Sequence, residues 1–429
     1  MLAALFVACS ARGQTTGTFM DRLAPTDLRV VSYNIYFDSV FTDTDPVRAA
    51  KFARVMTALN PDVVNLQEIY AHAPNHVVAL MNSILPLGGG ETWYAHQSDD
   101  NVIASKYPLS LQRTNTVPSH SRGIAIALVD LPDVQFTTDF YFMNNHYKCC
   151  GNPGGAEDAN RQRQSDALVN WMRDVRTAGG SETLPAGTPM AVVGDLNIVG
   201  SLDPLDNLIA GNIVNEGTYG ADSPPDWDGT SLADARPVHN GSGTVDYTWR
   251  NDNSGFAPGR LDFVLYTDHV ARSAHQFVLN TVSMSAAELA ATGLQTYDVT
   301  FDAQNYDHLP VVVDFRFVAD GTPGDFNLDR VVDALDYELW RQSNGSGTYG
   351  DAGGNGNGVM DAADYVIWRK YTTSAATALA VNNATSVPEP TSILLCLTLC
   401  GTLAAAQSAT RSARRFHTLR ISAQGTAAL

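Results

Sequence analysis

The sequence is poor in cysteine and in basic residues, and each scarcity excludes a class of protein. Its five cysteines stand at three places, Cys9, Cys396 with Cys400, and the adjacent pair Cys149–Cys150, so an ordinary long-range disulfide framework is excluded. The sequence has only 27 Lys and Arg but 45 Asp and Glu, which gives a formal net charge of -18. Proteins that hold nucleic acid by bulk electrostatic attraction need clustered basic residues. An acidic enzyme can still cleave a polyanion if bound metal ions locally reverse the charge of its site.

The adjacent cysteines Cys149 and Cys150 leave three states open. They close a vicinal disulfide, bridge to another chain or stay reduced. Disulfide geometry is hard to satisfy between sequence neighbours, so it disfavours the first state.

The N-terminal residues have the character of a secretory leader. Met1 to Ser10 form an apolar run with small residues around Ala8 to Ala11, as in the apolar region and cleavage zone of a signal peptide. Because no basic segment precedes them, we interpret residues 1–20 as a signal peptide truncated by a start codon placed too far downstream. The alternative is an N-terminus with a few chance apolar residues. The first interpretation predicts an exported protein, extracellular or on the surface of a bacterium.

The C-terminal residues carry a second export feature. Val387-Pro388-Glu389-Pro390 is followed by an apolar stretch over 393–406 and by a basic stop that begins at Arg411. Residues 387–416 therefore resemble the bacterial PEP-type C-terminal sorting signal, with residues 372–386 as a flexible linker. The apolar stretch is short of the about 20 residues that a stable transmembrane helix needs. We expect a transient membrane association, and a buried C-terminal helix is the alternative.

An internal duplication lies before this linker. The segment 336–341 recurs as 364–369, and each copy follows a loop in which oxygen-bearing residues have the spacing that wraps around Ca²⁺. The first loop offers Asp325, Asn327, Asp329, Val331, Asp333 and Asp336. The second loop offers Asn355, Asn357, Val359, Asp361 and Asp364.

Residues 322–371 thus resemble a type I dockerin, a small all-α module built on calcium loops. The resemblance implies bound Ca²⁺ and a cohesin-like protein partner. Gly353 stands at the first position of the second loop, where a ligand is expected, so calcium binding by that loop is in doubt. A polar turn without calcium is the alternative for either copy.

Residues 26–318 alternate strand-like and helix-like patterns, which predicts one large α/β domain. Helices are expected over 47–59, where an apolar stripe recurs at helical spacing, and over 160–176. Strands are expected over 28–35, 63–66, 124–129, 134–145, 189–194, 245–250, 261–266 and 311–317.

Polar side chains interrupt these apolar strands at their ends, where a buried carboxylate or amide destabilises the fold unless it has a partner. One such residue is more often a turn former than a catalyst, but several in chain order form a strong signal. They are Asn34, Glu68, His146, Asp195, Asn197, Asp262, Asp307 and His308.

The ordered set resembles the endonuclease/exonuclease/phosphatase superfamily, over about two thirds of the chain. The resemblance implies a four-layered sandwich of two mixed β-sheets flanked by helices, with the active site at one edge. It implies that Glu68 holds Mg²⁺ or Mn²⁺ with Asn34 beside it, and that Asp195 and Asn197 position and activate the attacking water. His308 is then the imidazole at the scissile phosphate.

Three further residues receive roles from the same resemblance. Asp262 fixes the tautomer of His308, Asp307 joins the metal site or orients the neighbour of His308, and His146 contacts the phosphate. Which histidine acts as acid and which as base stays open. The chemistry needs these residue types, because a negatively charged phosphodiester repels hydroxide until a metal ion and cationic donors neutralise it.

Some residues near these motifs have two interpretations each. Arg122 and Lys148 contact phosphate or belong to a solvated face, and the run 99–101 holds an additional acid to which we give low weight. The insertion over 215–260 is expected to place Trp227 and Trp249 on the substrate rim. The remaining histidines, His72 and His239 among them, are expected on the surface or in loops.

A secreted nuclease acting on a phosphodiester substrate is the first functional hypothesis. A sphingomyelinase-like or other phosphoesterase is the rival within the enzymes. A non-catalytic surface component, working through the dockerin-like repeat, is the alternative of a different class, and it requires the strand-end set to have decayed.

Overall fold

The computed structural model describes residues 16–116, 122–251, 253–299, 307–317, 324–326, 332–343 and 360–372. Most of the expected signal peptide, nearly all of the linker and the whole sorting segment lie outside these ranges, so those hypotheses stay predictions. None of the helices in the described ranges is long and apolar enough to cross a membrane.

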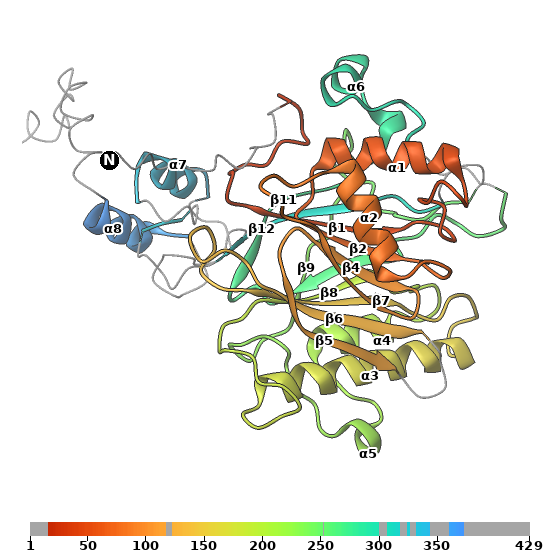
Figure 1. Cartoon of the computed structure of the whole chain (residues 1–429). Helices are drawn as coiled ribbons and strands as arrows, with labels where there is room; N and C mark the ends of the chain where they lie inside the picture. Colours follow the sequence, from red (N-terminus) through yellow and green to blue (C-terminus); the bar gives the residue numbers. More distant parts are fainter. Residues whose placement is uncertain are drawn as a thin grey trace, which may run out of the picture.

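Two six-stranded sheets form the centre of the large α/β domain, in agreement with the predicted fold (Figure 1). The first sheet, sheet A, has the order β11 (Ala271–Val278), β12 (Val311–Phe317), β1 (Leu28–Asn34), β2 (Val63–Gln67), β4 (Asn101–Ser105), β3 (Tyr94–Ser98). The second, sheet B, has the order β5 (Leu109–Thr116), β6 (Gly123–Val129), β7 (Phe140–His146), β8 (Met190–Asp195), β10 (Asp262–Tyr266), β9 (Ala233–Asp234). Both sheets are mixed, because β1 and β2 pair in parallel, as do β7 and β8.

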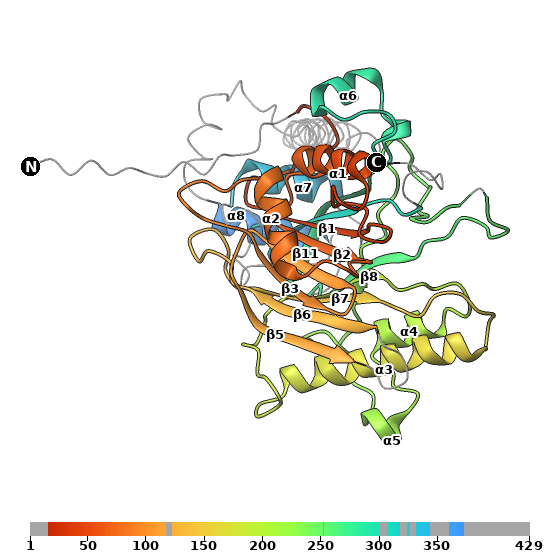
Figure 2. The same cartoon turned by 45° about the vertical axis from the view of Figure 1, so that its right-hand side comes forward.

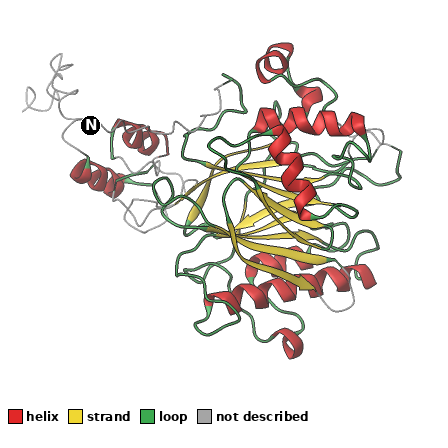
Figure 3. Cartoon of the chain, in the orientation of Figure 1, coloured by secondary structure: helices red, strands yellow, loops and turns green. Residues whose placement is uncertain are grey.

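Helices cover the outer faces of the two sheets (Figures 2 and 3). On the side of sheet A lie α1 (Pro46–Leu59) and α2 (Pro74–Ile84), and on the side of sheet B lie α3 (Ala156–Arg176) and α4 (Asp203–Ala210). Shorter elements sit in the connections: α5 (Glu216–Tyr219), η1 (Thr281–Ser283) and α6 (Ala286–Thr292). The helix–sheet–sheet–helix order confirms the four-layered α/β sandwich.

Helix α1 shows how local sequence sets these layers. The Asp45 side chain caps the helix by accepting hydrogen bonds from the Val47 and Arg48 amides, and Pro46 takes the first turn, where no amide donor is needed. The helix ends at Asn60, whose left-handed conformation is a common stop. Its apolar stripe is buried, as its spacing predicts.

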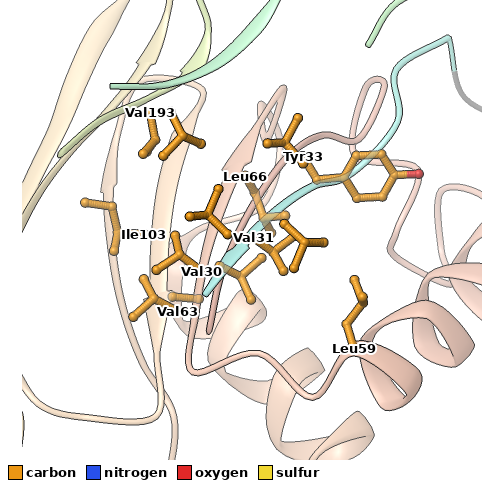
Figure 4. Packing of buried hydrophobic residues seen from close by; sticks show 14 of the residues in the cluster. Val30, Val31, Tyr33, Leu59, Val63, Leu66, Ile103 and Val193 are labelled. Atoms are coloured by element: carbon orange, nitrogen blue, oxygen red, sulfur yellow. The ribbon is translucent and has the colours of Figure 1, made fainter. Parts of the chain in front are cut away.

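Strand β1 is buried on both faces, because it lies between α1 and sheet B. Figure 4 shows Tyr33 and Leu59 on the helix side and Val30 and Val193 between the sheets. Side chains alternate along a strand, so the phase of Val30 places Asn34 on the face between the sheets as well.

Several expected strands differ from the observed ones. The run 134–145 becomes a strand only from Phe140 to His146, because the residues before it form a turn-rich connection. The expected strand over 245–250 does not form, and Trp249 makes only isolated bridges, to Gly259 and His308.

The duplicated segment forms two paired helices, α7 (Ala334–Ser343) and α8 (Ala362–Tyr371). The pairing is reciprocal: Trp340 Nε1 donates to the Asp361 carbonyl, and Trp368 Nε1 to the Asp333 carbonyl, both at 2.6 Å. Two equivalent copies therefore contact each other through equivalent atoms.

Five of the predicted calcium ligands can be placed. Asp325, Asp336 and Asp364 are buried, and Asp333 and Asp361 lie directly before the helices. The others lie outside the described residues: Asn327, Asp329, Val331, Asn355, Asn357 and Val359.

Candidate active site

The predicted strand-end residues meet at one edge of the two sheets. Parallel pairing aligns the ends of β1 with β2 and of β7 with β8, so that His146 stands opposite Asp195. Strand β10 runs the other way, and its first residue, Asp262, pairs with Asp195. The edge therefore collects the last residues of the parallel strands and the first residues of the antiparallel ones.

Asp195 is the residue that most of the others contact. Its Oδ2 accepts a hydrogen bond from Asn34 Nδ2 (3.2 Å) and lies 3.5 Å from His146 Nε2 and 3.7 Å from His308 Nε2. Its Oδ1 accepts from the Asn197 amide at 3.0 Å. Burial raises the pKa of Asp195 and the charge of Asp262 adds to this, so the pKa lies above its usual value although both histidines act to lower it.

The residue before Asp195 brings its strand close to β7. Gly194 has a φ of +120°, and a Cβ at this position would overlap the carbonyl oxygen of Asn145. Only glycine fits such a close backbone approach in this conformation. Gly194 thus helps to set the position of Asp195 beside His146.

His308 forms one of two histidine–carboxylate pairs. Its Nδ1 donates to Asp262 Oδ2 at 2.7 Å, and the Asp262 amide donates to Thr248 Oγ1. Burial by itself lowers the pKa of His308, but the carboxylates of Asp262 and Asp195 outweigh it and raise the pKa to about 10. With these neighbours the ring is a cation at neutral pH.

His146 forms the other pair, with an acid to which the sequence gave little weight. Its Nδ1 lies 2.6 Å from Asp100 Oδ2. Asp100 also accepts a hydrogen bond from the Tyr70 hydroxyl, and although burial raises the pKa of Asp100, the contact with His146 holds it below the usual value. Asp100 immediately precedes the buried strand β4, so the same strand-end rule would have found it.

Glu68 and Asn34 lie beside Asp195 and offer oxygen ligands. Asn34 Nδ2 donates to Glu68 Oε1 as well as to Asp195, and the Phe37 amide donates to Glu68 Oε2 at 3.0 Å. Hard carboxylate and amide oxygens suit Mg²⁺, so these residues fit the ion that the sequence predicts. Asp195, Asp262 and His308 also have ligand atoms within 4.8 Å of one another. A protonated His308, paired with Asp262 through Nδ1, has no lone pair to offer a metal ion, and we therefore favour Glu68 as the centre of a metal site.

Asp307 stands next to His308, but its carboxylate is already engaged. Its Oδ2 accepts from Trp249 Nε1 at 3.1 Å, and its carbonyl accepts from the Arg250 amide. This places Trp249 beside Asp307 and His308, and its place on a substrate rim stays a prediction. The same expectation is wrong for Trp227, whose Nε1 donates to the Thr188 carbonyl, at the end of β8 opposite to Asp195.

Two of the histidines expected on the surface or in loops lie in loops and are enclosed there. His239 is buried, and half-buried His72 lies between Asp38, 2.9 Å from its Nδ1, and Asp43, 3.2 Å from its Nε2. His239 is held by the Tyr247 carbonyl, 2.7 Å from its Nε2.

The residues after His146 contact Arg122 and include the two adjacent cysteines. Arg122 Nη1 donates to the Tyr147 carbonyl at 3.2 Å. Cys149 and Cys150 are free thiols with their sulfur atoms 3.0 Å apart, and the contact between the thiols raises the pKa of Cys150. The two sulfur atoms are not bonded to each other here, and a bridge to another chain or a reduced pair stays open.

Comparison with solved structures gives similar folds. TDP2 from C. elegans is 15% identical, with 69% of this chain and 76% of that chain covered and a TM-score of 0.43. The human Nocturnin catalytic domain, with bound sulfate, is 16% identical over 68% and 95%, TM-score 0.44. An endonuclease/exonuclease/phosphatase from Bacteroides vulgatus is 15% identical over 68% and 99%, TM-score 0.44.

Comparison by sequence gives the family. No curated protein matches the chain. The profile described as "Endonuclease/Exonuclease/phosphatase family" matches residues 31–285, which is more than half of the sequence and includes Asn34, Glu68, His146, Asp195 and Asp262. The chain belongs to the endonuclease/exonuclease/phosphatase family.

Proposed function

We propose that this chain is a divalent-metal-dependent phosphodiesterase that hydrolyses nucleic acid. The observation that carries the proposal is the convergence of two carboxylate-bound histidines on one oxygen of Asp195, beside Glu68. General acid–base catalysis needs positioned groups on both sides of a reacting atom. Asp195 and His146 would provide them, with His308 as the cation beside them.

The residues divide the work of an in-line displacement at phosphorus. Asp195, whose raised pKa favours accepting a proton, orients the attacking water with Asn197. His308 is a cation that opposes the negative charge developing on the phosphoryl oxygens. His146 stands at the same carboxylate from the side of sheet B, from which it can exchange a proton with the leaving oxygen. Glu68 and Asn34 would hold the ion, which supplies Lewis-acid neutralisation of the phosphate when bound.

Hydrolysis of defined substrates by the full chain tests the proposal. Supercoiled plasmid, single-stranded RNA and sphingomyelin are incubated with Mg²⁺ or EDTA. We expect metal-dependent nucleic acid cleavage that Asp195→Ala and His308→Ala remove. His269→Ala is the matched control, because this exposed histidine lies near Asp228 and outside the site. Cleavage of the lipid alone moves the assignment to a sphingomyelinase-like enzyme, and no cleavage in any tube contradicts the proposal.

The duplicated segment supports a second, separate proposal. We propose that residues 322–371 form a calcium-binding docking module for a cohesin-like partner. The reciprocal indole–carbonyl hydrogen bonds support it, because each ties one helix to the end of the other loop. The buried carboxylates of Asp336 and Asp364, at the last loop positions, lie where calcium ligands are expected.

Calcium titration of the full chain tests this module. We expect tryptophan fluorescence to change with Ca²⁺ and the change to be lost in Asp336→Ala. Asp364→Ala reports on the second loop, which lacks its first ligand. A fluorescence signal that ignores Ca²⁺ in the unaltered chain rejects the proposal.

A further inference from the structure

Three aromatic side chains lie exposed beside the proposed metal-binding acid. Tyr36, Phe37 and Tyr70 are 39%, 57% and 48% exposed. Their rings contact one another: Tyr36 and Phe37 meet edge to face with centroids 5.1 Å apart, and Phe37 stacks on Tyr70 at 5.5 Å. We name these three residues the aromatic platform. Contiguous exposed apolar surface of this kind marks a binding site more often than isolated exposed residues do.

The platform is joined to the active site at two points. The Phe37 amide donates to Glu68 Oε2 at 3.0 Å, and the Tyr70 hydroxyl donates to Asp100, the partner of His146. The Phe37 ring therefore stands within the reach of one nucleotide from a phosphate held at Glu68.

The backbone under the platform is strained and firmly held. Tyr36, Phe37 and Asp38 adopt successive left-handed conformations, with φ of 55°, 50° and 58°. Such residues cost free energy and persist only where the surroundings enforce them. Asp38 enforces them here, because its buried carboxylate accepts from the Tyr70 amide and contacts His72. The unfavourable backbone conformation is thus maintained where it keeps the Tyr36 and Phe37 side chains exposed.

On the basis of the proposed function, we infer that the platform stacks an unpaired nucleobase next to the scissile phosphate, so that the substrate is single-stranded nucleic acid. A base in a duplex is already stacked on its neighbours and cannot offer its face. Stacking also suits the charge of this protein. An aromatic ring binds a neutral base without the basic groove that the net charge of -18 disfavours.

A membrane fits the platform less well than a base. Tyrosine rings also suit a membrane interface, but the Tyr70 hydroxyl is bonded to Asp100 and the Phe37 amide to Glu68. The rings therefore belong to the site and do not form a separate insertion loop.

Quenching of a 2-aminopurine-labelled single strand, with EDTA present to prevent cleavage, tests stacking directly. We expect the full chain to quench the label and Phe37→Leu, which keeps apolar bulk without a ring, to lose most of the quenching. Tyr70→Phe retains the ring and should retain quenching. Tyr94→Leu is the matched control: this tyrosine is 38% exposed but pairs with Ser105, at the opposite end of β3 from Asp100.

Steady-state kinetics with Mg²⁺ separate stacking from catalysis. For a single strand we expect Phe37→Leu to raise KM roughly 5- to 150-fold, the range that base–aromatic stacking spans, with kcat unchanged. A strand with an abasic residue beside the scissile bond should have the same KM for the unaltered and variant chains.

The outcomes distinguish this inference from the proposed function. Quenching that depends on Phe37 without cleavage of any strand retains the platform and rejects the nuclease. Cleavage with the same KM in Phe37→Leu, or binding of sphingomyelin vesicles that needs Phe37 while strand binding does not, overturns the platform.

Discussion

The two ends of strand β1 hold buried polar groups in opposite ways. At the start of β1, Arg29 donates two hydrogen bonds of 2.7 Å to the Asp314 carboxylate of β12. Arg29 also donates to the Leu59 carbonyl. At its last residue, Asn34 binds Asp195 and Glu68, two acids with a third, Asp262, close by. The Arg29 end of β1 therefore holds a matched ion pair, whereas several carboxylates lie close together around the Asn34 end.

The difference separates a structural from a functional use of charge. Burial raises the pKa of Asp314, but the bonds from Arg29 and His275 bring it below its usual value, so folding favours the charged form. The pKa of Asp195 is raised instead, and within the described part of the chain Asp262 Oδ1 is buried without a hydrogen-bond partner. Such unsatisfied acids cost stability, and clustered perturbed groups mark functional sites.

Asp195→Asn should break this contrast most strongly. The amide cannot accept the proton of the attacking water, so we expect kcat to fall by about 10²–10⁴-fold. The variant also removes a buried charge beside Asp262, so the free energy of unfolding in EDTA should stay equal or rise. Plasmid cleavage and urea unfolding measure the two effects. A variant that unfolds more easily and keeps its kcat reverses the proposed roles of the two ends.

Asp314→Asn should give the opposite result. The substitution leaves the buried guanidinium of Arg29 without its charged partner, which typically lowers the free energy of unfolding by about 3–5 kcal/mol. The kcat of the folded fraction should remain that of the unaltered chain, because Asp314 lies away from the strand ends that form the site. The urea midpoint gives the stability, and plasmid cleavage below that midpoint gives kcat. If kcat falls as far as it does in Asp195→Asn, the Arg29–Asp314 pair is not purely structural.

The sequence predicts these two ends unequally. Asp195 and His308 interrupt apolar runs at strand ends, so a local pattern exposes them. Arg29 and Asp314 lie inside strands and are 285 residues apart, and their pairing depends on β1 meeting β12, which no local pattern shows. Asp100 combines the two cases: its place directly before β4 is a local signal, but its pairing with His146 of the other sheet is not.

Turn-rich composition is a weaker guide still. It correctly predicts that the segment around Trp227 is an irregular connection, but not which end of the sandwich that connection covers. Trp227 packs against the buried cluster that sheet B forms with α3 and α4, and its Nε1 donates to the Thr188 carbonyl; these two contacts set the direction.

The smallest expected effect is a difference in how the two ends respond to pH. The folded pKa of His308, about 10, lies above its unfolded value of about 6.5, so its contribution to stability is complete below the unfolded value and is lost as pH rises through the folded one. Asp314 has a lowered folded pKa, so its contribution is present above the unfolded value of about 3.9 and is lost as pH falls through the folded one.

Urea unfolding in EDTA between pH 3 and 10 should therefore show two separate slopes, each up to about 1.4 kcal/mol per pH unit. His308→Gln should flatten only the alkaline slope and Asp314→Asn only the acidic one. An alkaline slope that survives in His308→Gln assigns the lost proton to another group, and the raised pKa of His308 then no longer supports its role as the cation at the phosphate.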